Sequence, residues 1–281
     1  MEEQGILYLC ATPIGNLEDI TLRVLKILKE VDMIAAEDTR RTLNLLNYYK
    51  IKSPIISYHE HNKGKRGKEI IRKLQEGQRV ALVADAGTPG ISDPGFELIK
   101  ECIESGIRVI SLPGPCAAVT AVTVSGFPIN RFVFYSFLSK KKKDRRKEME
   151  EIAGQDKTVV IYEAPHRLLR TLKELLEFIG DREAAVCREL SKLYEEVKRG
   201  TFSELICYFE STPPKGEITL VIEGKEEDGP CIRGSLIQGV EEVRQLKEAG
   251  LREKEAVKRV ARYLSLPVRE LYKKVIEEKE E

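Results

Sequence analysis

The chain has 281 residues, of which 33% are charged and 6% aromatic, and its formal net charge at pH 7 is only +1. This near-neutrality argues against binding of nucleic acid by the surface as a whole, so any site for a polyanion must be local. The six cysteines lie far apart without a CxxC pair, which argues against zinc and disulfide frameworks and indicates a reducing, cytoplasmic location.

The first half of the chain alternates strand-like and helix-like segments. Apolar runs predict strands at residues 6–10, 32–36, 55–58, 81–84 and 108–112. Helical patterns occupy residues 20–30, 68–76 and 96–105. The simplest arrangement is a mostly parallel sheet with right-handed crossovers. The N-terminus lacks signal-peptide features, and no apolar run approaches about 20 residues, so no membrane span is expected.

The loop DAGTPGISDPG, residues 85–95, is the most informative stretch of this half. It follows a buried strand and precedes a helix, the place where a parallel sheet holds ligands. Three glycines and two prolines make the backbone stiff and open, so it offers amides and carbonyls more than side chains. A tight turn without a ligand is the alternative. The first loop, residues 11–19, has a single glycine and therefore neither the GxGxxG nor the GxxxxGK[ST] fingerprint.

Further polar or stiff segments follow other predicted strands: EDTR at 37–40, HEHNKGKRGKE at 59–69, SLPGPCAAVTA at 111–121 and EAPHR at 163–167. Asp38 fits a helix N-cap, whereas Arg40 and Arg41 fit that interpretation less well because cations are unfavourable at a helix N-terminus. His166 could be a general base, a phosphate contact or a structural cap. His59 and His61 lack a third ligand placed with them, so no metal site is predicted.

Residues 140–147 form a basic segment with seven cations and one anion, a local charge of +6. A solvated run of charge is one interpretation. The functional one is an arm that binds phosphates and gains counterion release from a polyanion.

The second half predicts another α/β domain with a mixed sheet and then a helical tail. Strands are expected at 132–137, 158–162, 183–187 and 218–223, with helices at 168–179 and 202–209. The tail has helical stretches at 236–249, 252–264 and 268–278, typical of a helix-turn-helix module, a helical cap or a dimer contact. The predicted domains are 1–115 and 116–225, followed by a linker at 226–234 and the tail at 235–281.

No nucleophile elbow, zinc signature or paired-carboxylate motif is present, so a cofactor-bound group transfer fits the stiff loops best. With TPIGNLED and AEDTR near the N-terminus, DAGTPGISDPG, SLPGPCAAVTA and YEAPHR make residues 5–225 resemble the tetrapyrrole-methylase superfamily. Within it the chain is most similar to the branch that methylates a cytidine 2′-oxygen in the decoding region of 16S rRNA. The resemblance implies two α/β domains with S-adenosylmethionine in the cleft between them, a homodimer, and no metal.

The resemblance also implies site residues. The cofactor contacts fall on Pro13, Ala86, Gly87, Thr88, Ile91, Cys116, Ala117, Glu163 and Gly216. The chain departs from its tetrapyrrole-modifying relatives in two places, because it has GTP where they have GDP in the central loop and it lacks their GxGxG in the first loop.

The implied reaction is attack of a ribose 2′-oxygen on the activated methyl group, helped by a base that takes the hydroxyl proton. The strand-end positions leave Asp38, Asp85, Asp93 and His166 as candidates for that base. Expected contacts to 16S rRNA, free or in the small ribosomal subunit, are Arg40, Lys63, Lys140, Lys141, Lys142, Lys143, Arg145, Arg146 and Arg167. The alternatives are a methylase of a corrin or porphyrin precursor and a non-enzymatic nucleic-acid-binding protein built around the tail.

Overall fold

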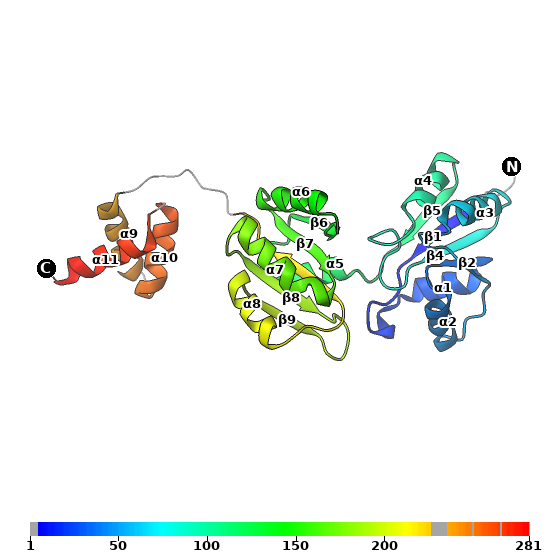
Figure 1. Ribbon diagram of the computed structural model, residues 1–281. Coiled ribbons are helices and arrows are strands. Elements are labelled where there is room, and N and C mark those ends of the chain that lie inside the picture. Colours follow the sequence, from blue (N-terminus) through cyan, green and yellow to red (C-terminus); the bar gives the residue numbers. More distant parts are fainter. Residues whose placement is uncertain (1–4, 226–234, 249, 265, 281) are drawn as a thin grey trace. The chain divides into compact units, whose positions relative to one another are not determined.

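The computed structural model describes residues 5–225, 235–248, 250–264 and 266–280 (Figure 1). The chain divides into two compact units, residues 1–225 and 226–281, and each is described by itself. The predicted linker, 226–234, lies outside the described residues. Among the helices that are described, none has the length and apolar character needed to cross a membrane.

The first unit contains two five-stranded sheets, and the first of them is entirely parallel. Its strands are β1 (Ile6–Cys10), β2 (Met33–Ala36), β3 (Ile55–Ser57), β4 (Arg79–Val83) and β5 (Arg108–Leu112), in the order β3-β2-β4-β1-β5. Cys10 is in register with Val83 and with Leu112. The loops after β1, β4 and β5 therefore leave the sheet at one edge, as the parallel arrangement predicts.

Helices cover both faces of this sheet (Figure 1). The buried side chains of α1 (Leu22–Glu30), which follows the short η1 (Leu17–Asp19), pack on one face with those of α2 (Thr39–Tyr48). Buried side chains of α3 (Lys63–Gln75) and α4 (Phe96–Glu104) pack on the other face.

The start of α3 corrects the prediction that this helix begins at residue 68, after a polar segment. The Asn62 side chain accepts a hydrogen bond from the His59 amide and donates to the Ser57 carbonyl, which fixes the turn and lets the helix begin at Lys63. The basic residues Lys63, Lys65 and Arg66 are thus helical.

The second sheet is mixed, as predicted. It consists of β6 (Phe132–Phe137), β7 (Thr158–Glu163), β8 (Glu183–Arg188), β9 (Glu196–Thr201) and β10 (Ile218–Ile222), in the order β6-β7-β10-β8-β9. β6 is parallel to β7, whereas β10 is antiparallel to both β7 and β8. The edge strand β9 was not predicted, because its sequence EVKRGT is polar and contains a glycine, as is common for edge strands.

Three helices, α6 (Lys142–Ala153), α7 (Pro165–Ile179) and α8 (Phe202–Ser211), bury their apolar side chains on one face of this sheet. The other face is covered by α5 (Ala117–Ser125), and Ile14 from the first loop joins that apolar cluster. Because Ile14 shares this cluster with Val160 and Val221 of the second sheet, the loop after β1 lies against the second sheet.

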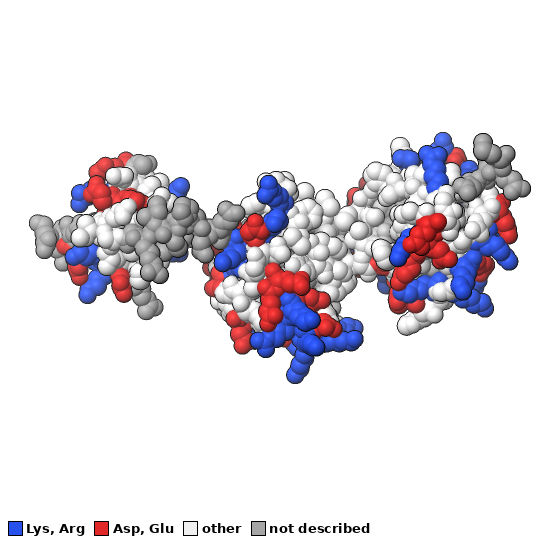
Figure 2. All heavy atoms as spheres, turned by 90° about the horizontal axis from the view of Figure 1, so that it is seen from above, with Lys and Arg blue, Asp and Glu red and all other residues white. Residues whose placement is uncertain are grey.

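The second unit is a separate helical module. Its helices α9 (Leu236–Glu248), α10 (Glu253–Tyr263) and α11 (Val268–Glu280) share an apolar core that includes Val243, Val260 and Leu271. On the face that Figure 2 shows, charges of both signs are interspersed and a broad uncharged area lies in the middle of the first unit. A site for a polyanion on this face would therefore be a local patch.

Candidate functional site

A cavity of about 350 Å³ lies within the first unit and is lined by loops that follow strands of the first sheet and by strands of the second. The β4–α4 loop, the start of α5, the end of β7 and the start of β10 form its wall. Most of the wall is apolar or backbone, and the charged side chains in it are the carboxylates Asp93, Glu163 and Glu217. This combination of shape and charge suits a ligand with apolar parts and a positive group.

Backbone contacts hold the loops of the cavity in place. Thr12 and Gly87 exchange two hydrogen bonds of 2.9 Å, so the loops after β1 and β4 are tied together. Gly87 has a φ of +80°, a conformation open to glycine at little cost.

A strained pair of serines supports the same wall. Ser92 and Ser136 have φ values of 66° and 55°, and the Ser136 hydroxyl donates to the Ser92 hydroxyl at 2.7 Å. Ser136 lies where the pairing of β6 with β7 changes register. Strain and a bulge beside a cavity are typical of a functional site.

Eight of the nine residues predicted to contact the cofactor line this one cavity: Ala86, Gly87, Thr88, Ile91, Cys116, Ala117, Glu163 and Gly216. The ninth, Pro13, lines a second cavity instead. Sequence reasoning missed other wall residues, including Ile14, Phe137, Tyr162 and Thr219. Ile14 and Tyr162 stand inside the TPIGNLED and YEAPHR motifs and could have been found there, whereas Phe137 and Thr219 carry no such signal.

Asp93 is the one candidate base that lines this cavity. Burial, the nearby Glu37 and the nearby Asp85 together raise its pKa from the ordinary value of 3.8 to about 7. Burial and the charge of Asp85 also raise the pKa of Glu37, whose buried Oε2 has no hydrogen-bond partner among the described residues. A carboxyl group with a pKa near 7 is well suited to accept a proton at neutral pH.

The three other candidate bases do not line this cavity and are therefore less well placed to take a proton from a ligand in it. Asp38 caps α2, and its hydrogen bonds with Arg40 lower its pKa to about 2, which makes it a weak base. Asp85 accepts a hydrogen bond from the Asp38 amide and pairs with Arg41, facing the second cavity. His166 is exposed at the start of α7 and lines neither cavity.

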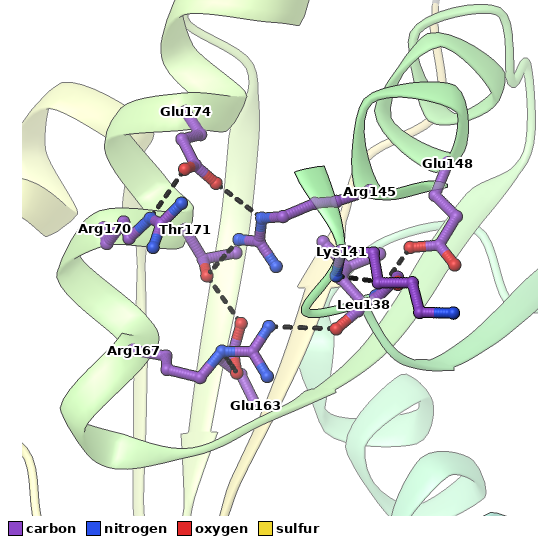
Figure 3. A network of polar contacts seen from close by, with 10 residues as sticks. Leu138, Lys141, Arg145, Glu148, Glu163, Arg167, Arg170, Thr171 and Glu174 are labelled. Carbon is purple, nitrogen blue, oxygen red and sulfur yellow. Dashed lines mark hydrogen bonds and ion pairs between the residues drawn. The ribbon is translucent and has the colours of Figure 1, made fainter. Parts of the chain in front are cut away.

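Glu163 ends a buried network that runs from the cavity wall to α6 (Figure 3). One carboxylate oxygen, Oε1, accepts the Ala164 amide and pairs with Arg167 at 3.3 Å, and Oε2 accepts the Thr171 hydroxyl at 2.5 Å. Thr171 in turn accepts Arg145 Nη2 at 2.8 Å. Glu163 is only 2% exposed, so these partners hold its carboxylate in one position.

The network corrects one predicted RNA contact. Arg145 is 6% exposed, and its Nε donates to Glu174 Oε2 at 2.7 Å, so it holds α6 against α7 and is not free to meet a phosphate. Although burial alone would raise the pKa of Glu174, hydrogen bonds from Arg170 and Arg145 lower it.

The remaining predicted contacts differ in availability. Arg167 also donates to the Leu138 carbonyl, and Lys63 pairs with Glu60 and Glu97. Arg40 pairs with Asp38, but the Arg40 side chain is 88% exposed. By contrast, the side chains of Lys140, Lys141, Lys142 and Lys143 are exposed and form no ion pair with any described residue. The four lysines are thus the most available part of the basic segment, together with the 72% exposed Arg146.

Residues 6–206 match the family described as Tetrapyrrole (Corrin/Porphyrin) Methylases. The chain is 48% identical to a ribosomal RNA small subunit methyltransferase I of Synechocystis over 97% of this chain and 98% of the relative. It is 53% identical to the protein of that name from Thermotoga maritima over 79% of this chain and 100% of the relative.

Two solved structures resemble the first unit in fold. Diphthine synthase has a TM-score of 0.63 at 13% identity, covering 78% of this chain and 90% of that structure. Uroporphyrin-III C-methyltransferase from Thermus thermophilus, complexed with S-adenyl homocysteine, has a TM-score of 0.55 at 17% identity, covering 78% and 96%.

Proposed function

Because the chain belongs to the family of tetrapyrrole (corrin/porphyrin) methylases, we propose that it transfers a methyl group from S-adenosylmethionine to the 2′-oxygen of a cytidine in the decoding region of 16S rRNA. The observation that carries the proposal is the convergence of eight predicted cofactor contacts on one cavity. The names of relatives that align over nearly their whole length support ribosomal RNA of the small subunit as the substrate.

The cavity fits this cofactor. Small residues and backbone groups at Gly87, Ala117 and Gly216 leave room for a close approach, and the carboxylates of the wall favour a positive sulfonium. When bound, S-adenosylmethionine supplies an already activated methyl group. The residues of this chain then have two tasks, which are to hold the acceptor ribose in line with the methyl group and to remove the proton of its hydroxyl group.

We assign the second task to Asp93. Its carboxyl group faces the cavity and has a pKa of about 7, so a large fraction is ionised at neutral pH while the group remains basic enough to accept a proton. The carboxylate would take the 2′-hydroxyl proton as the oxygen–methyl bond forms and the methyl–sulfur bond of the cofactor breaks, which releases S-adenosylhomocysteine. Protonated Asp93 would then return the proton to water.

The turn around Gly216 gives a direct test of the cofactor cavity. Gly216 has a φ of +83°, and a Cβ added there would overlap the carboxylate of Glu189, which accepts the Glu217 amide at 2.8 Å. We expect Gly216→Ala to weaken S-adenosylmethionine binding by roughly tenfold or more in calorimetry, because the displaced turn forms part of the wall. Gly180→Ala is the matched control, since Gly180 has a φ of +78° and open space around it. Equal cofactor affinity in the two variants would contradict the assignment of this wall.

We propose that the exposed lysines at 140–143 bind phosphates of the RNA. Replacing all four with alanine should lower RNA affinity and flatten its dependence on salt, by about 0.7–0.9 in the log–log slope for each lost phosphate contact. The control changes net charge equally by replacing four exposed lysines elsewhere: Lys26, Lys29, Lys68 and Lys100. An unchanged slope in the first variant would show that these four lysines do not contact RNA.

The activity is tested by incubating the protein with S-adenosylmethionine labelled in its methyl group and either small-subunit rRNA or a corrin or porphyrin precursor. We expect label in the RNA alone. Label in the tetrapyrrole alone would favour the alternative enzyme, and RNA binding without cofactor binding would favour the non-enzymatic alternative.

The homodimer that the family resemblance implies and the cytoplasmic location that the cysteine pattern indicates belong to the same proposal. Large apolar side chains such as Leu22, Leu193 and Tyr194 are 85%, 89% and 71% exposed in the single chain, which supports a surface covered by a second copy. Sedimentation at micromolar concentration tests the dimer.

A further inference from the structure

A second cavity of about 320 Å³ lies beside α2 in the first unit. Its wall combines one side of α2 with the segment after β1 and the end of β4: Thr12, Pro13, Leu17, Arg41, Thr42, Asn44, Leu45, Tyr48, Ala84 and Asp85. Of the residues that line this cavity, only Pro13 and Asp85 were predicted to take part in methyl transfer, as a cofactor contact and a candidate base. None of them was a predicted RNA contact.

The two cavities share a thin wall. Pro13 lines the second cavity and Ile14 the first, and likewise Asp85 lines the second and Ala86 the first. Between them runs the backbone bridge of Thr12 with Gly87, reinforced by the Thr12 hydroxyl, which donates to the Ala84 carbonyl at 3.0 Å. Because neighbouring residues of the same two loops face the two cavities, one layer of backbone separates them.

The side of α2 that faces the second cavity carries unusual chemistry for a helix surface. Arg41, Asn44, Leu45 and Tyr48 recur at the spacing of one helical face. The Asn44 side-chain amide has no hydrogen-bond partner in the described part of the chain. Tyr48 is 60% exposed, and its ring makes a T-shaped contact with the Tyr49 ring at 4.9 Å between centroids. This face thus offers an amide and a phenol ring for recognition, together with a guanidinium.

Two polar side chains that line the second cavity, Arg41 and Asp85, match the groups of a cytidine nucleotide. The Arg41 side chain is 66% exposed and pairs with Asp85 Oδ2 at 3.3 Å, while Asp85 Oδ1 accepts the Asp38 amide at 2.9 Å. A carboxylate can accept several hydrogen bonds, and it accepts readily from the exocyclic amino group of cytosine. The same carboxylate would repel the carbonyl that uracil carries at that position.

We propose that the second cavity binds the base of the RNA nucleotide whose ribose is methylated. The base stacks on Tyr48, its Watson–Crick edge meets Asn44 and Asp85, and Arg41 contacts the adjoining phosphate. Enzymes that act on one nucleotide commonly extrude it into such a pocket and read it in this way. The inference rests on the proposed function, because it places the base beside the cavity that holds the methyl donor.

Photo-crosslinking tests the site independently of catalysis. The probe is a short RNA with the decoding-region sequence that carries 5-iodocytidine at the target position. We expect the crosslink in the tryptic peptide of residues 42–50, at Tyr48, and its loss in Tyr48→Ala. A crosslink confined to other peptides would overturn the proposal even if the protein methylates RNA.

Kinetics with a matched pair of variants provides the second test. Asn44 and Asn47 are both exposed asparagines of α2, but only Asn44 lines the cavity. We expect Asn44→Ala to reduce the preference for a cytidine over a uridine at the target by roughly tenfold. Tyr48→Ala should raise the KM for RNA roughly 5- to 150-fold through loss of stacking. Asn47→Ala should change neither.

The outcomes separate this inference from the proposed function. Methyl transfer with unaltered kinetics in both Asn44→Ala and Tyr48→Ala would leave the function standing and overturn the second cavity as the base site. A tenfold or larger loss of S-adenosylmethionine affinity in these variants would also overturn it, because the cavity would then belong to the cofactor. A crosslink at Tyr48 without methyl transfer would support the nucleotide site and refute the methyltransferase.

Discussion

Replacing Asp93 with asparagine is expected to lower the rate of methyl transfer by about 10²- to 10⁴-fold, the usual contribution of a general base. The amide keeps the size of the side chain but cannot accept the hydroxyl proton. S-adenosylmethionine should still bind, since most of the cavity wall is unchanged. Single-turnover rates and calorimetry measure the two effects separately.

The pH dependence gives the same prediction a sharper form. Since burial and the neighbouring carboxylates raise the pKa of Asp93 to about 7, kcat/KM of the unaltered protein should rise about tenfold per pH unit below 7 and level off above it. A bound sulfonium in the same cavity favours the ionised carboxylate, so the inflection in kcat should lie at a lower pH. Asp93→Asn should abolish both inflections.

Asp38→Asn is the matched control for the base. Asparagine is as good an N-cap as aspartate, so α2 keeps its cap and loses only the exposed pair with Arg40. We expect nearly full activity. The assignment would be wrong if Asp38→Asn lost the activity and Asp93→Asn kept it.

The raised pKa also predicts an effect on stability. A carboxyl group whose pKa is raised on folding binds a proton more tightly in the folded chain, so the free energy of unfolding falls as the pH rises from about 4 to about 7. Asp93→Asn removes that dependence and should increase the melting temperature at pH 8 but not at pH 4. Such a gain in stability with a loss of activity is typical of a catalytic group.

Replacing Arg145 with alanine is expected to destabilise the protein by about 3 kcal/mol, the lower end of the range for removing one partner of a buried ion pair. Glu174 keeps Arg170, but the hydrogen bond to Thr171 is lost, and Thr171 is fully buried. For a protein of this size the melting temperature should fall by roughly 6–12 °C.

The adjacent Arg146 is the control for this substitution. Its side chain is 72% exposed, and among the described residues it pairs only with the exposed Glu150 and the ring of Phe178. Arg146→Ala should therefore change stability by about 0.5 kcal/mol or less. An Arg145→Ala variant with an unchanged melting temperature and a flatter salt dependence of RNA binding would restore Arg145 as a phosphate contact.

Much of the fold could be predicted from the sequence where local signals agree with the tertiary environment. The strands at residues 108–112 and 132–137 begin and end where they were predicted, because each is an apolar run bounded by charged or turn residues. The start of α3 depends on hydrogen bonds of Asn62, and β9 depends on pairing with β8. Neither produces an apolar pattern, so neither could be predicted.

The candidate site, like the fold, could be predicted from the sequence only in part. The resemblance to the family implied Ala86, Ala117 and Gly216 as cofactor contacts, and all three line one cavity of the structure. The choice of Asp93 needs its burial and its acidic neighbours, which no local pattern reveals. Arg145 was misassigned for a related reason, since its partner Glu174 lies 29 residues away on another helix.

The most direct test of the whole account is to determine where the methyl group ends up. Small-subunit rRNA treated with the protein and S-adenosylmethionine is digested to nucleosides and examined by mass spectrometry, with the position mapped by resistance to alkali. We expect 2′-O-methylcytidine at one position of the decoding region. A methyl group on a base, or RNA that acquires none, would contradict the proposed function.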